Sequence, residues 1–259
     1  MNTYFPSDYQ AFIHTSRYAK WLDSENRREN WGETVNRYVD NLVLPKITDD
    51  ETVMAVREAI TNLDVMPSMR AMMSSGKAFD RDNTAGYNCS YLPVDDIRSF
   101  DEAMFILLCG TGVGFSVERQ YVNELPIVPM NLINLDETII VADSKEGWAW
   151  SLRTLITSLY NGVVPKWDVT RVRPAGAKLR TFGGRASGPA PLVDLFQFVV
   201  SKFKEASGDR LTSLHCHDIM CKIGEVVVVG GVRRSAMISL SNLSDDRMRH
   251  AKSGAYWEA

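Results

Sequence analysis

The stretch GYNCSYLPVDD, residues 86–96, places one of the four cysteines of this chain inside a short strand-like run. A cysteine can be a small buried side chain, or its sulfur can act as a nucleophile or redox group. A buried thiol without a neighbouring base is inert, so residue types alone favour packing for Cys89. The same holds for Cys109, at the end of an apolar helix. Whether Cys89 is chemically active stays open on residue types alone.

Three glycine-rich stretches could bring backbone close to a ligand. GTGVGF, residues 110–115, lacks the third glycine of a dinucleotide fingerprint, and a strand follows where a helix should. RTFGGRASGP, residues 180–189, combines arginines with glycines ahead of a helix, which suits phosphate or a flexible surface loop about equally. VGGVRRSA, residues 229–236, puts two arginines at a strand entrance, and only one of them can easily face a given site.

The segment HCHDIMC, residues 215–221, has the composition of a metal site. On a helix, His217 and Cys221 lie one turn apart and could share an ion. A structural zinc site needs four ligands, usually in two short pairs, and the chain has no second pair. We therefore expect these residues to serve packing or the surface, and we expect no metal site.

Composition excludes several classes of protein. With 259 residues and 45% apolar residues, the chain can bury a sizeable core. Its longest apolar runs are too short to cross a bilayer, and its first residues do not form a secretory signal, so no membrane partner is expected. A net charge of −3 argues against direct nucleic-acid binding. Four cysteines without framework spacing favour a reducing, cytoplasmic location.

The elements that must position these motifs change in character along the chain. Residues 1–62 have helical periodicity, including an Asp-capped helix in DDETVMAVREAITNL. From residue 63 to 259, strand-like runs alternate with helices, which is typical of an α/β domain. A different segment, about 122–178, begins with extended proline-rich chain and continues as the amphipathic helix of DSKEGWAWSLRTLITSLYNG. Asp143 and Glu146 predict its capping box.

In this order, the motifs resemble those of a ribonucleotide reductase, and the resemblance spans almost the whole chain. It is closest to the adenosylcobalamin-dependent, class II enzymes, in particular the monomeric type that reduces ribonucleoside triphosphates. The motifs that carry it are PSMRAMMSSG, YNCSYLPVDD, CGTGVGFSVER, DSKEGWAWSLR, FGGRASGP and GGVRRSAMISL. The resemblance implies an α/β fold: an N-terminal helical region, then the first half of a ten-stranded α/β barrel with an inserted helical effector-site segment.

The resemblance gives Cys89 a role. In the family, the cysteine at this position is one of two thiols that reduce the substrate ribose and become a disulfide. A thiyl radical elsewhere removes the 3′ hydrogen, and the 2′ hydroxyl leaves as water. A thioredoxin-like reductant regenerates the thiols, and adenosylcobalamin supplies the radical.

Other roles follow from the same resemblance. The substrate would contact five residues: Ser68, Asn88, Gly112, Arg233 and Arg234. A deoxynucleotide effector would be bound by another five: Asp96, Arg180, Gly183, Gly184 and Ser187. FGGRASGP resembles the first specificity loop of the family and GGVRRS the second.

One departure matters. The radical cysteine of the family lies in an N-x-C-x-E finger loop, and this chain has no such motif. The resemblance therefore implies an N-terminal part of a reductase, inactive alone, whose partner is the missing C-terminal half carrying the second redox thiol and most corrin contacts. Two alternatives stay open: a fragment of a class I large subunit, and a catalytically silent nucleotide-binding remnant.

Overall fold

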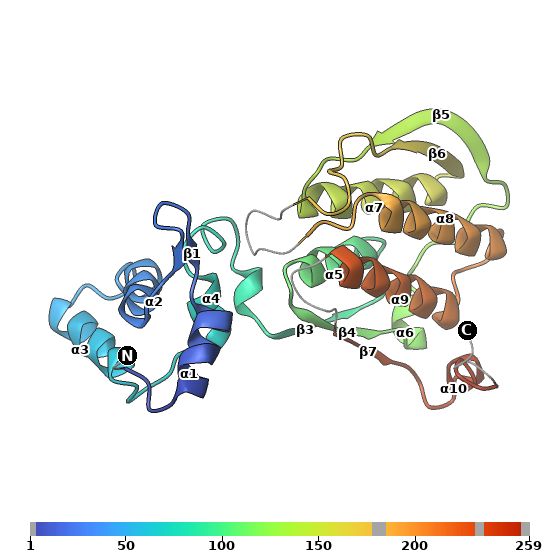
Figure 1. Ribbon diagram of the computed structural model, residues 1–259. Helices are drawn as coiled ribbons and strands as arrows, with labels where there is room; N and C mark the ends of the chain where they lie inside the picture. The colour runs from blue at the N-terminus through green and yellow to red at the C-terminus, as the bar shows by residue number, and fades with distance from the viewer. Residues whose placement is uncertain (1–3, 178–184, 231–235, 255–259) are drawn as a thin grey trace. The chain divides into compact units, whose positions relative to one another are not determined.

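The computed structural model describes residues 4–177, 185–230 and 236–254 (Figure 1). The chain divides into two compact units, Met1–Tyr87 and Asn88–Ala259. The boundary after residue 62 and the insertion limits of about 122–178 stay predictions.

The first unit is built mainly from short helices, with one two-stranded antiparallel hairpin that the sequence did not predict. The hairpin pairs Trp21 with Arg28 and Leu22 with Arg27. The elements are α1 (Asp8–Ile13), the π-helical turn His14–Tyr18, β1 (Trp21–Leu22), β2 (Arg27–Arg28), α2 (Trp31–Tyr38), the π-helical turn Val39–Val43, α3 (Asp50–Thr61), α4 (Met69–Ser74) and the 3₁₀ turn Thr84–Gly86.

Side-chain caps fix where two of these helices begin. Asn30 and Glu33 form a reciprocal capping box at the start of α2. Asp49 accepts a hydrogen bond from the N–H of Thr52 and caps α3, as the sequence predicted. These bonds satisfy backbone donors that a helix start otherwise leaves unpaired.

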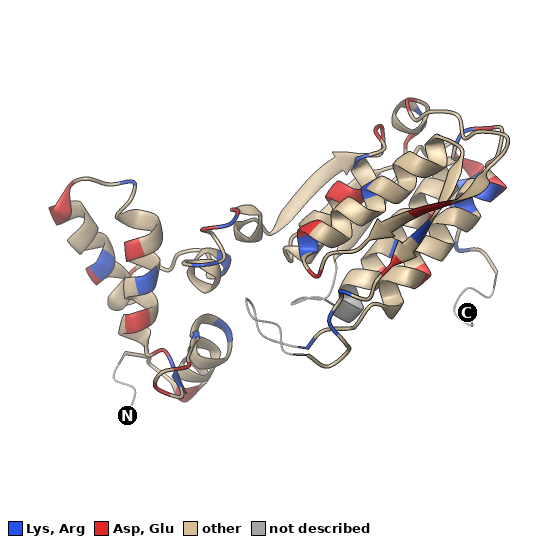
Figure 2. Ribbon diagram, turned by 90° about the horizontal axis from the view of Figure 1, so that it is seen from above, with Lys and Arg blue, Asp and Glu red and all other residues tan. Residues whose placement is uncertain are grey.

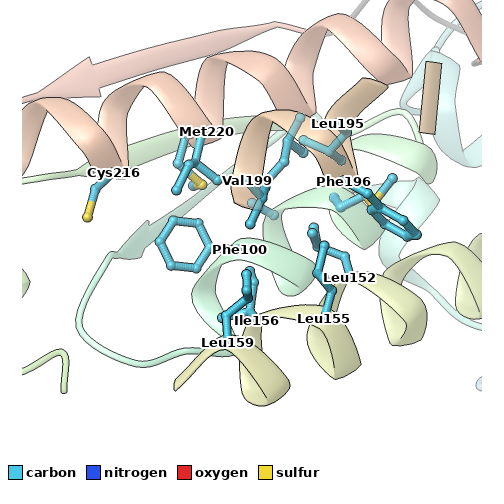
Figure 3. Close-up of a cluster of buried hydrophobic side chains, with 14 of the residues drawn as sticks. Phe100, Leu152, Leu155, Ile156, Leu159, Leu195, Phe196, Val199, Cys216 and Met220 are labelled. Carbon is cyan, nitrogen blue, oxygen red and sulfur yellow. The ribbon is translucent and has the colours of Figure 1, made fainter. Parts of the chain in front are cut away.

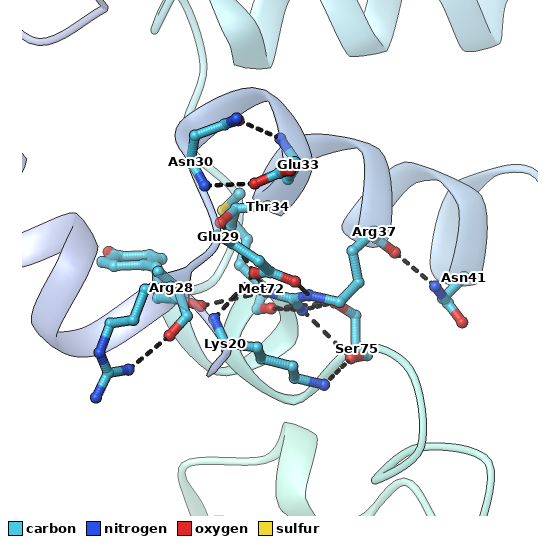
Figure 4. Close-up of polar contacts among 12 residues, drawn as sticks. Lys20, Arg28, Glu29, Asn30, Glu33, Thr34, Arg37, Asn41, Met72 and Ser75 are labelled. Atoms are coloured by element: carbon cyan, nitrogen blue, oxygen red, sulfur yellow. Dashed lines mark hydrogen bonds and ion pairs between the residues drawn. The ribbon is translucent and has the colours of Figure 1, made fainter. Parts of the chain in front are cut away.

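A buried ion pair connects several elements of the first unit (Figure 4). Arg37 of α2 donates from Nε to Oε1 of Glu29 at 2.7 Å and from Nη2 to Oε2 at 2.8 Å. Its Nη1 donates to the carbonyl oxygen of Met72 at 2.6 Å and to the hydroxyl of Ser75 at 2.5 Å. This one guanidinium therefore joins the hairpin to α4 and the turn that follows it.

The second unit contains a three-stranded parallel sheet in the order β3-β4-β7. Parallel neighbours need a crossover, and α5 supplies it between β3 and β4. The bounds are β3 (Cys89–Pro93), α5 (Ser99–Leu108), β4 (Gly112–Ser116), α6 (Arg119–Val122), α8 (Ala190–Glu205), α9 (Ser213–Gly230), β7 (Met237–Leu240) and α10 (Asp246–Arg249).

Between α6 and α8 the chain forms a separate β-α-β arrangement. The strands β5 (Ile133–Ile140) and β6 (Val163–Asp168) pair in parallel and flank α7 (Lys145–Tyr160). The sequence predicted the helix but neither strand. The predicted cap was wrong: Ser144 caps α7 by accepting from the N–H of Gly147, whereas Asp143 binds Arg173 with an oxygen–nitrogen distance of 2.8 Å.

Four helices of the second unit bury a shared apolar core (Figure 3). They are α5, α7, α8 and α9. The amphipathic helix predicted in DSKEGWAWSLRTLITSLYNG is confirmed: the apolar stripe of α7 (Leu152, Leu155, Ile156 and Leu159) lies in this core, and Trp148 packs against it. The labelled core side chains are Phe100, Leu152, Leu155, Ile156, Leu159, Leu195, Phe196, Val199, Cys216 and Met220. This core supports the sheet from one side and so fixes the strands that carry Cys89 and Gly112.

Charges of both signs are interspersed along the helices (Figure 2). This distribution agrees with the near balance of 29 basic and 32 acidic residues. Within the part of the chain that the structure describes, no helix combines the length and apolar character needed to span a bilayer. The α/β fold class predicted from the sequence is confirmed, while the half-barrel stays a prediction.

Candidate active site

Cys89 is the first residue of β3 and its side chain is exposed. Side chains alternate between the two faces of a strand. Leu92 points into the core, so Cys89 and Tyr91 share the opposite face. The free thiol therefore lies on the side of the sheet that the core helices do not occupy.

The neighbouring strands keep the surroundings of Cys89 open. Gly112 is paired with Cys89 in the register of β3 and β4, and Gly114 is paired with Tyr91. The N–H of Gly112 donates to the carbonyl oxygen of Asn88 at 2.9 Å. Two glycines on this face leave β4 without side chains beside the thiol, which allows another molecule to approach the backbone.

Apolar side chains border this glycine strip. Tyr91 is 54% exposed, and Ile238 and Leu240 of β7 are 63% and 42% exposed. Large exposed apolar side chains gathered on one sheet face mark a surface that binds something. We call the face formed by Cys89, Tyr91, Gly112, Gly114 and Ile238 the thiol face.

Asp96 lies three residues beyond the other end of β3 and is exposed. Its carboxylate accepts from the backbone N–H of Arg98 at 2.8 Å and from Nε of the same residue at 3.2 Å. The backbone hydrogen bond, together with the Arg98 guanidinium, lowers the pKa of Asp96. Asp96 is therefore an ionised acceptor held at the end of the strand.

The chain on either side of residues 178–184 is closed by hydrogen bonds. The N–H of Gly176 donates to the carbonyl oxygen of Ala186, and the N–H of Ala186 donates to that of Ala177, both at 2.8 Å. Nη1 of Arg185 also donates to the carbonyl oxygen of Gly176 at 2.9 Å. Ser187 donates its hydroxyl to the carbonyl oxygen of Gly188 at 3.1 Å. The predicted first specificity loop thus has an ordered base.

The other predicted site residues are placed as follows. Arg180, Gly183 and Gly184, and likewise Arg233 and Arg234, lie outside the described residues. Ser68 is exposed at the amino end of α4, in the first unit. The structure thus brings together Cys89, Asn88 and Gly112, whereas Asp96 and Ser187 lie elsewhere in the same unit.

The residues of HCHDIMC lie on α9, as predicted. His217 Nε2 lies 3.5 Å from the Sγ of Cys221, and its Nδ1 lies 2.9 Å from the hydroxyl of Ser239. Cys216 points into the core instead, where burial raises the pKa of its thiol. Among the described residues, no group of three or more His, Cys, Asp or Glu side chains is arranged to hold a metal ion.

Residues 131–202 match the family model for the insertion domain of B12-dependent ribonucleotide reductases. This match covers β5, α7, β6 and most of α8. The chain is thus similar to the B12-dependent, class II ribonucleotide reductases over these residues. The resemblance carried by its sequence motifs is thereby confirmed.

Curated class II reductases are similar to nearly the whole chain. The adenosylcobalamin-dependent ribonucleoside-triphosphate reductase of Lactobacillus helveticus is 30% identical over 297 residues, and that of Lactobacillus gasseri is 28% identical over 300 residues. Each alignment covers 87% of this chain and 40% of the relative. The chain thus spans about two fifths of the length of these relatives.

A solved structure confirms the fold. A crystal structure of a B12-dependent, class II ribonucleotide reductase superimposes with a TM-score of 0.80 and 24% sequence identity. The superposition covers 96% of this chain and 44% of the other. At this identity the likeness supports the fold of the chain and nothing finer.

Several residues of the candidate site were not predicted from the sequence. Tyr91, Gly114 and Ile238 belong to the thiol face, and period-two alternation outward from Cys89 could have found the first. The pairing of β7 with β4 could not be predicted locally, because the paired residues Gly114 and Ile238 are 124 positions apart in the sequence, so Ile238 had no local signal. The contact between Lys145 and Cys109, described below, joins two motifs that were interpreted separately.

Proposed function

We propose that this chain supplies the reducing thiol and the effector-binding elements of an adenosylcobalamin-dependent ribonucleoside-triphosphate reductase. The observation that carries this proposal is the position of Cys89: an exposed thiol at the start of a parallel strand, opposite Gly112 on an uncovered sheet face. A thiol used only for packing has no reason to occupy that face. The similarity to named reductases of this kind supports the same activity.

In the proposed reaction Cys89 and a second thiol deliver two electrons and two protons to the ribose. The 2′ hydroxyl leaves as water, the 2′ carbon gains a hydrogen and the two sulfurs become a disulfide. An external thioredoxin-like dithiol then restores both thiols by thiol–disulfide exchange. Exposure of Cys89 suits both steps, because substrate and reductant must reach the same sulfur.

Substrate and effector contacts extend the proposal. We assign Asn88 and Gly112 to the substrate because they adjoin Cys89, and Ser68, Arg233 and Arg234 by motif alone. We assign Asp96 to the effector because it is an ionised acceptor in the same unit. The ordered base around Ser187 supports an effector role for the loop with Arg180, Gly183 and Gly184.

The remainder of such an enzyme has to complete the site. The chain spans 40% of the length of its relatives and has no N-x-C-x-E motif, so we place the adenosylcobalamin site in that remainder. We propose that the segment with the N-x-C-x-E loop pairs with this chain and that the complete enzyme works in the cytoplasm.

A complementation assay tests the proposal. The purified chain is mixed with a separately expressed segment from a class II reductase that carries the N-x-C-x-E loop, and deoxynucleotide formation is measured with a ribonucleoside triphosphate, adenosylcobalamin and thioredoxin. We expect turnover from the mixture only. Turnover by this chain alone, or none from a mixture shown to be a complex, would overturn the proposal.

Two serine variants sharpen the assay. Cys89→Ser should abolish multiple turnover in the mixture, since a hydroxyl cannot form the disulfide. Cys221→Ser is the matched control, because Cys221 is also an exposed free thiol of the same unit. Equal multiple turnover by both variants would contradict the role of Cys89.

A further inference from the structure

The amine of Lys145 lies against the sulfur of Cys109. Nζ of Lys145 donates to Sγ of Cys109 at 3.0 Å, within the 2.7–3.2 Å range typical of N–H···O bonds and short for a sulfur acceptor. Cys109 is the C-cap residue that follows α5 and is 3% exposed, and Lys145 is the first residue of α7. The contact therefore joins the CGTGVGF motif to the DSKEGW motif, and the proposed reduction at Cys89 does not use it.

Neighbouring groups hold the amine in this place. Nζ of Lys145 lies 4.7 Å from the centre of the Phe105 ring, in the geometry of a cation–π contact. One oxygen of Glu146 lies 3.9 Å from the same nitrogen. With its side chain 21% exposed, Lys145 keeps its amine directed at one buried sulfur.

A second bridge keeps the two helices in register. Asp101 of α5 and Arg153 of α7 form an ion pair with an oxygen–nitrogen distance of 2.7 Å. Eight residues separate Asp101 from Cys109 on α5, and eight separate Lys145 from Arg153 on α7. Equal spacing on two antiparallel helices spans equal length, so the ion pair holds the amine opposite the sulfur.

We propose that Cys109 and Lys145 form a redox-sensitive modification site, in which hydroperoxide converts the pair into a sulfenamide cross-link. Peroxide first oxidises the Cys109 thiol to a sulfenic acid and is reduced to water or an alcohol. The Lys145 amine, after losing its ammonium proton, then attacks Sγ. An S–N bond forms, the S–O bond breaks, and the hydroxyl leaves as water with a second proton from the amine.

The cross-link is reversible by thiols. Two equivalents of a thiol cleave the S–N bond, return the Cys109 thiol and the Lys145 amine, and become a disulfide. A nitrogen held at hydrogen-bond distance captures the sulfenic acid before a second oxidation makes the irreversible sulfinic acid. The link also ties α7 to the turn before Gly112, the residue paired with Cys89. It thus connects oxidative stress to the thiol face.

Peptide mapping after peroxide treatment tests this site. The whole chain is treated with hydrogen peroxide, unreacted thiols are alkylated, and the protease digest is analysed by mass spectrometry. We expect one species that joins the peptides containing Cys109 and Lys145 and has lost two hydrogen atoms. Dithiothreitol should remove it and restore tryptic cleavage after Lys145.

Three variants make the test decisive. Lys145→Arg keeps a cation beside the sulfur but removes the primary amine, so the cross-link should disappear and sulfinic acid at Cys109 should increase. Cys109→Ala should also abolish it, and Cys216→Ala, which removes another buried thiol of the second unit, should not. Circular dichroism before treatment verifies that each variant is folded.

Other products would overturn the proposal. They are sulfinic acid at Cys109 with an unmodified Lys145 in the unsubstituted chain, a disulfide that includes Cys109, or a link that persists in Lys145→Arg. None of these readouts depends on reductase activity, so the inference can fail while the proposed function stands.

Discussion

The two units are stabilised at their centres by different interactions. The first unit combines a buried ion pair, Glu29 with Arg37, with a small apolar cluster around Trp31 (Figure 4). The second unit fills its centre with aliphatic and aromatic side chains from four helices, in a much larger cluster (Figure 3). In the smaller unit, one multiply bonded side chain therefore adds to the packing of a few apolar residues, whereas the larger unit relies on packing alone at its centre.

The second unit also contains a carboxylate–arginine pair, and its surroundings differ. Glu29 accepts hydrogen bonds from Arg37, from the N–H of Lys20 at 3.0 Å and from the hydroxyl of Thr34 at 3.1 Å. Asp101 is paired with Arg153, whose side chain is 41% exposed. The first carboxylate is enclosed by donors, and the second has a half-exposed partner at the margin of an apolar core.

The largest expected change in the free energy of unfolding comes from a substitution in the apolar core of the second unit. Phe100 of α5 is fully buried, so Phe100→Ala leaves a cavity and should lower the free energy of unfolding by about 3–5 kcal/mol. Leu243→Ala is the control, because Leu243 is 94% exposed and should tolerate the change. Urea denaturation followed by circular dichroism measures both, and equal effects would contradict a packed centre.

Breaking the ion pair of the first unit should lower the free energy of unfolding by nearly as much. Arg37→Met leaves the carboxylate of Glu29 buried without its cation, which should cost about 3 kcal/mol. Arg27→Met removes a similar partner from Glu33, but that pair is exposed, so a much smaller change is expected. Urea denaturation of both variants provides the comparison.

A double variant then asks whether the charge itself is needed. Replacing both partners, as Glu29→Leu with Arg37→Met, removes the uncompensated charge and should recover much of the loss. If the double variant is less stable than Arg37→Met alone, the hydrogen bonds that Glu29 accepts from Lys20 and Thr34 contribute more than its unpaired charge costs.

Each unit has a glycine near the start of a helix, and replacing the two glycines with alanine should change stability in opposite directions. A Cβ at Gly147 of α7 would lie 2.6 Å from the carbonyl oxygen of Ala142, so Gly147→Ala should destabilise the chain by about 1–3 kcal/mol. A Cβ at Gly32 of α2 meets nothing closer than 3.4 Å, so Gly32→Ala should stabilise by up to about 1 kcal/mol. Thermal unfolding of the two variants shows whether the signs differ.

Local sequence patterns predicted several elements of this chain, whereas features that depend on long-range pairing were not predicted. The stripe of α7 and the Asp49 cap follow from spacing within a few residues, and both are confirmed. The strands β5 and β6 were missed because they pair with each other across a helix, and β5 is too exposed to show a clear apolar alternation. The capping role went to Asp143 by pattern, but Arg173, 30 residues away, binds that carboxylate.

The candidate site shows the same difference between features that are local in the sequence and features that depend on long-range pairing. The six motifs together indicated the resemblance to class II reductases, because the residues of each motif are contiguous in the sequence, and the comparisons agree with it. The openness of the thiol face depends on the register of β3 with β4 and of β4 with β7, which no short motif contains. The paired arginines of the predicted second loop lie outside the described residues, so their roles stay predictions.

The smallest expected effect is the contribution of two carboxylates, Glu29 and Asp101, to the pH dependence of stability. Burial raises the pKa of Glu29, but the hydrogen bonds from Arg37, Lys20 and Thr34 outweigh it, so the net pKa is lowered. The pKa of Asp101 is raised, because burial outweighs the opposing effect of Arg153.

The signs of the two contributions are opposite. The stabilisation from Glu29 is fully present above the pKa of an unfolded glutamate, near 4.5, and is lost as pH falls through its lower native pKa. Asp101 binds its proton more tightly in the native state. Its ionised form therefore reduces stability at neutral pH, and this cost disappears as pH falls through its raised pKa.

Single amide variants measure these contributions. The free energy of unfolding is recorded from about pH 6 to about pH 3 for the unsubstituted chain, Glu29→Gln and Asp101→Asn. On acidification, the advantage of the unsubstituted chain over Glu29→Gln should shrink, whereas its stability relative to Asp101→Asn should rise. If the free energies of unfolding of the two variants change with pH in the same way, Glu29 and Asp101 contribute alike to stability. The predicted difference between the two carboxylates would then be wrong.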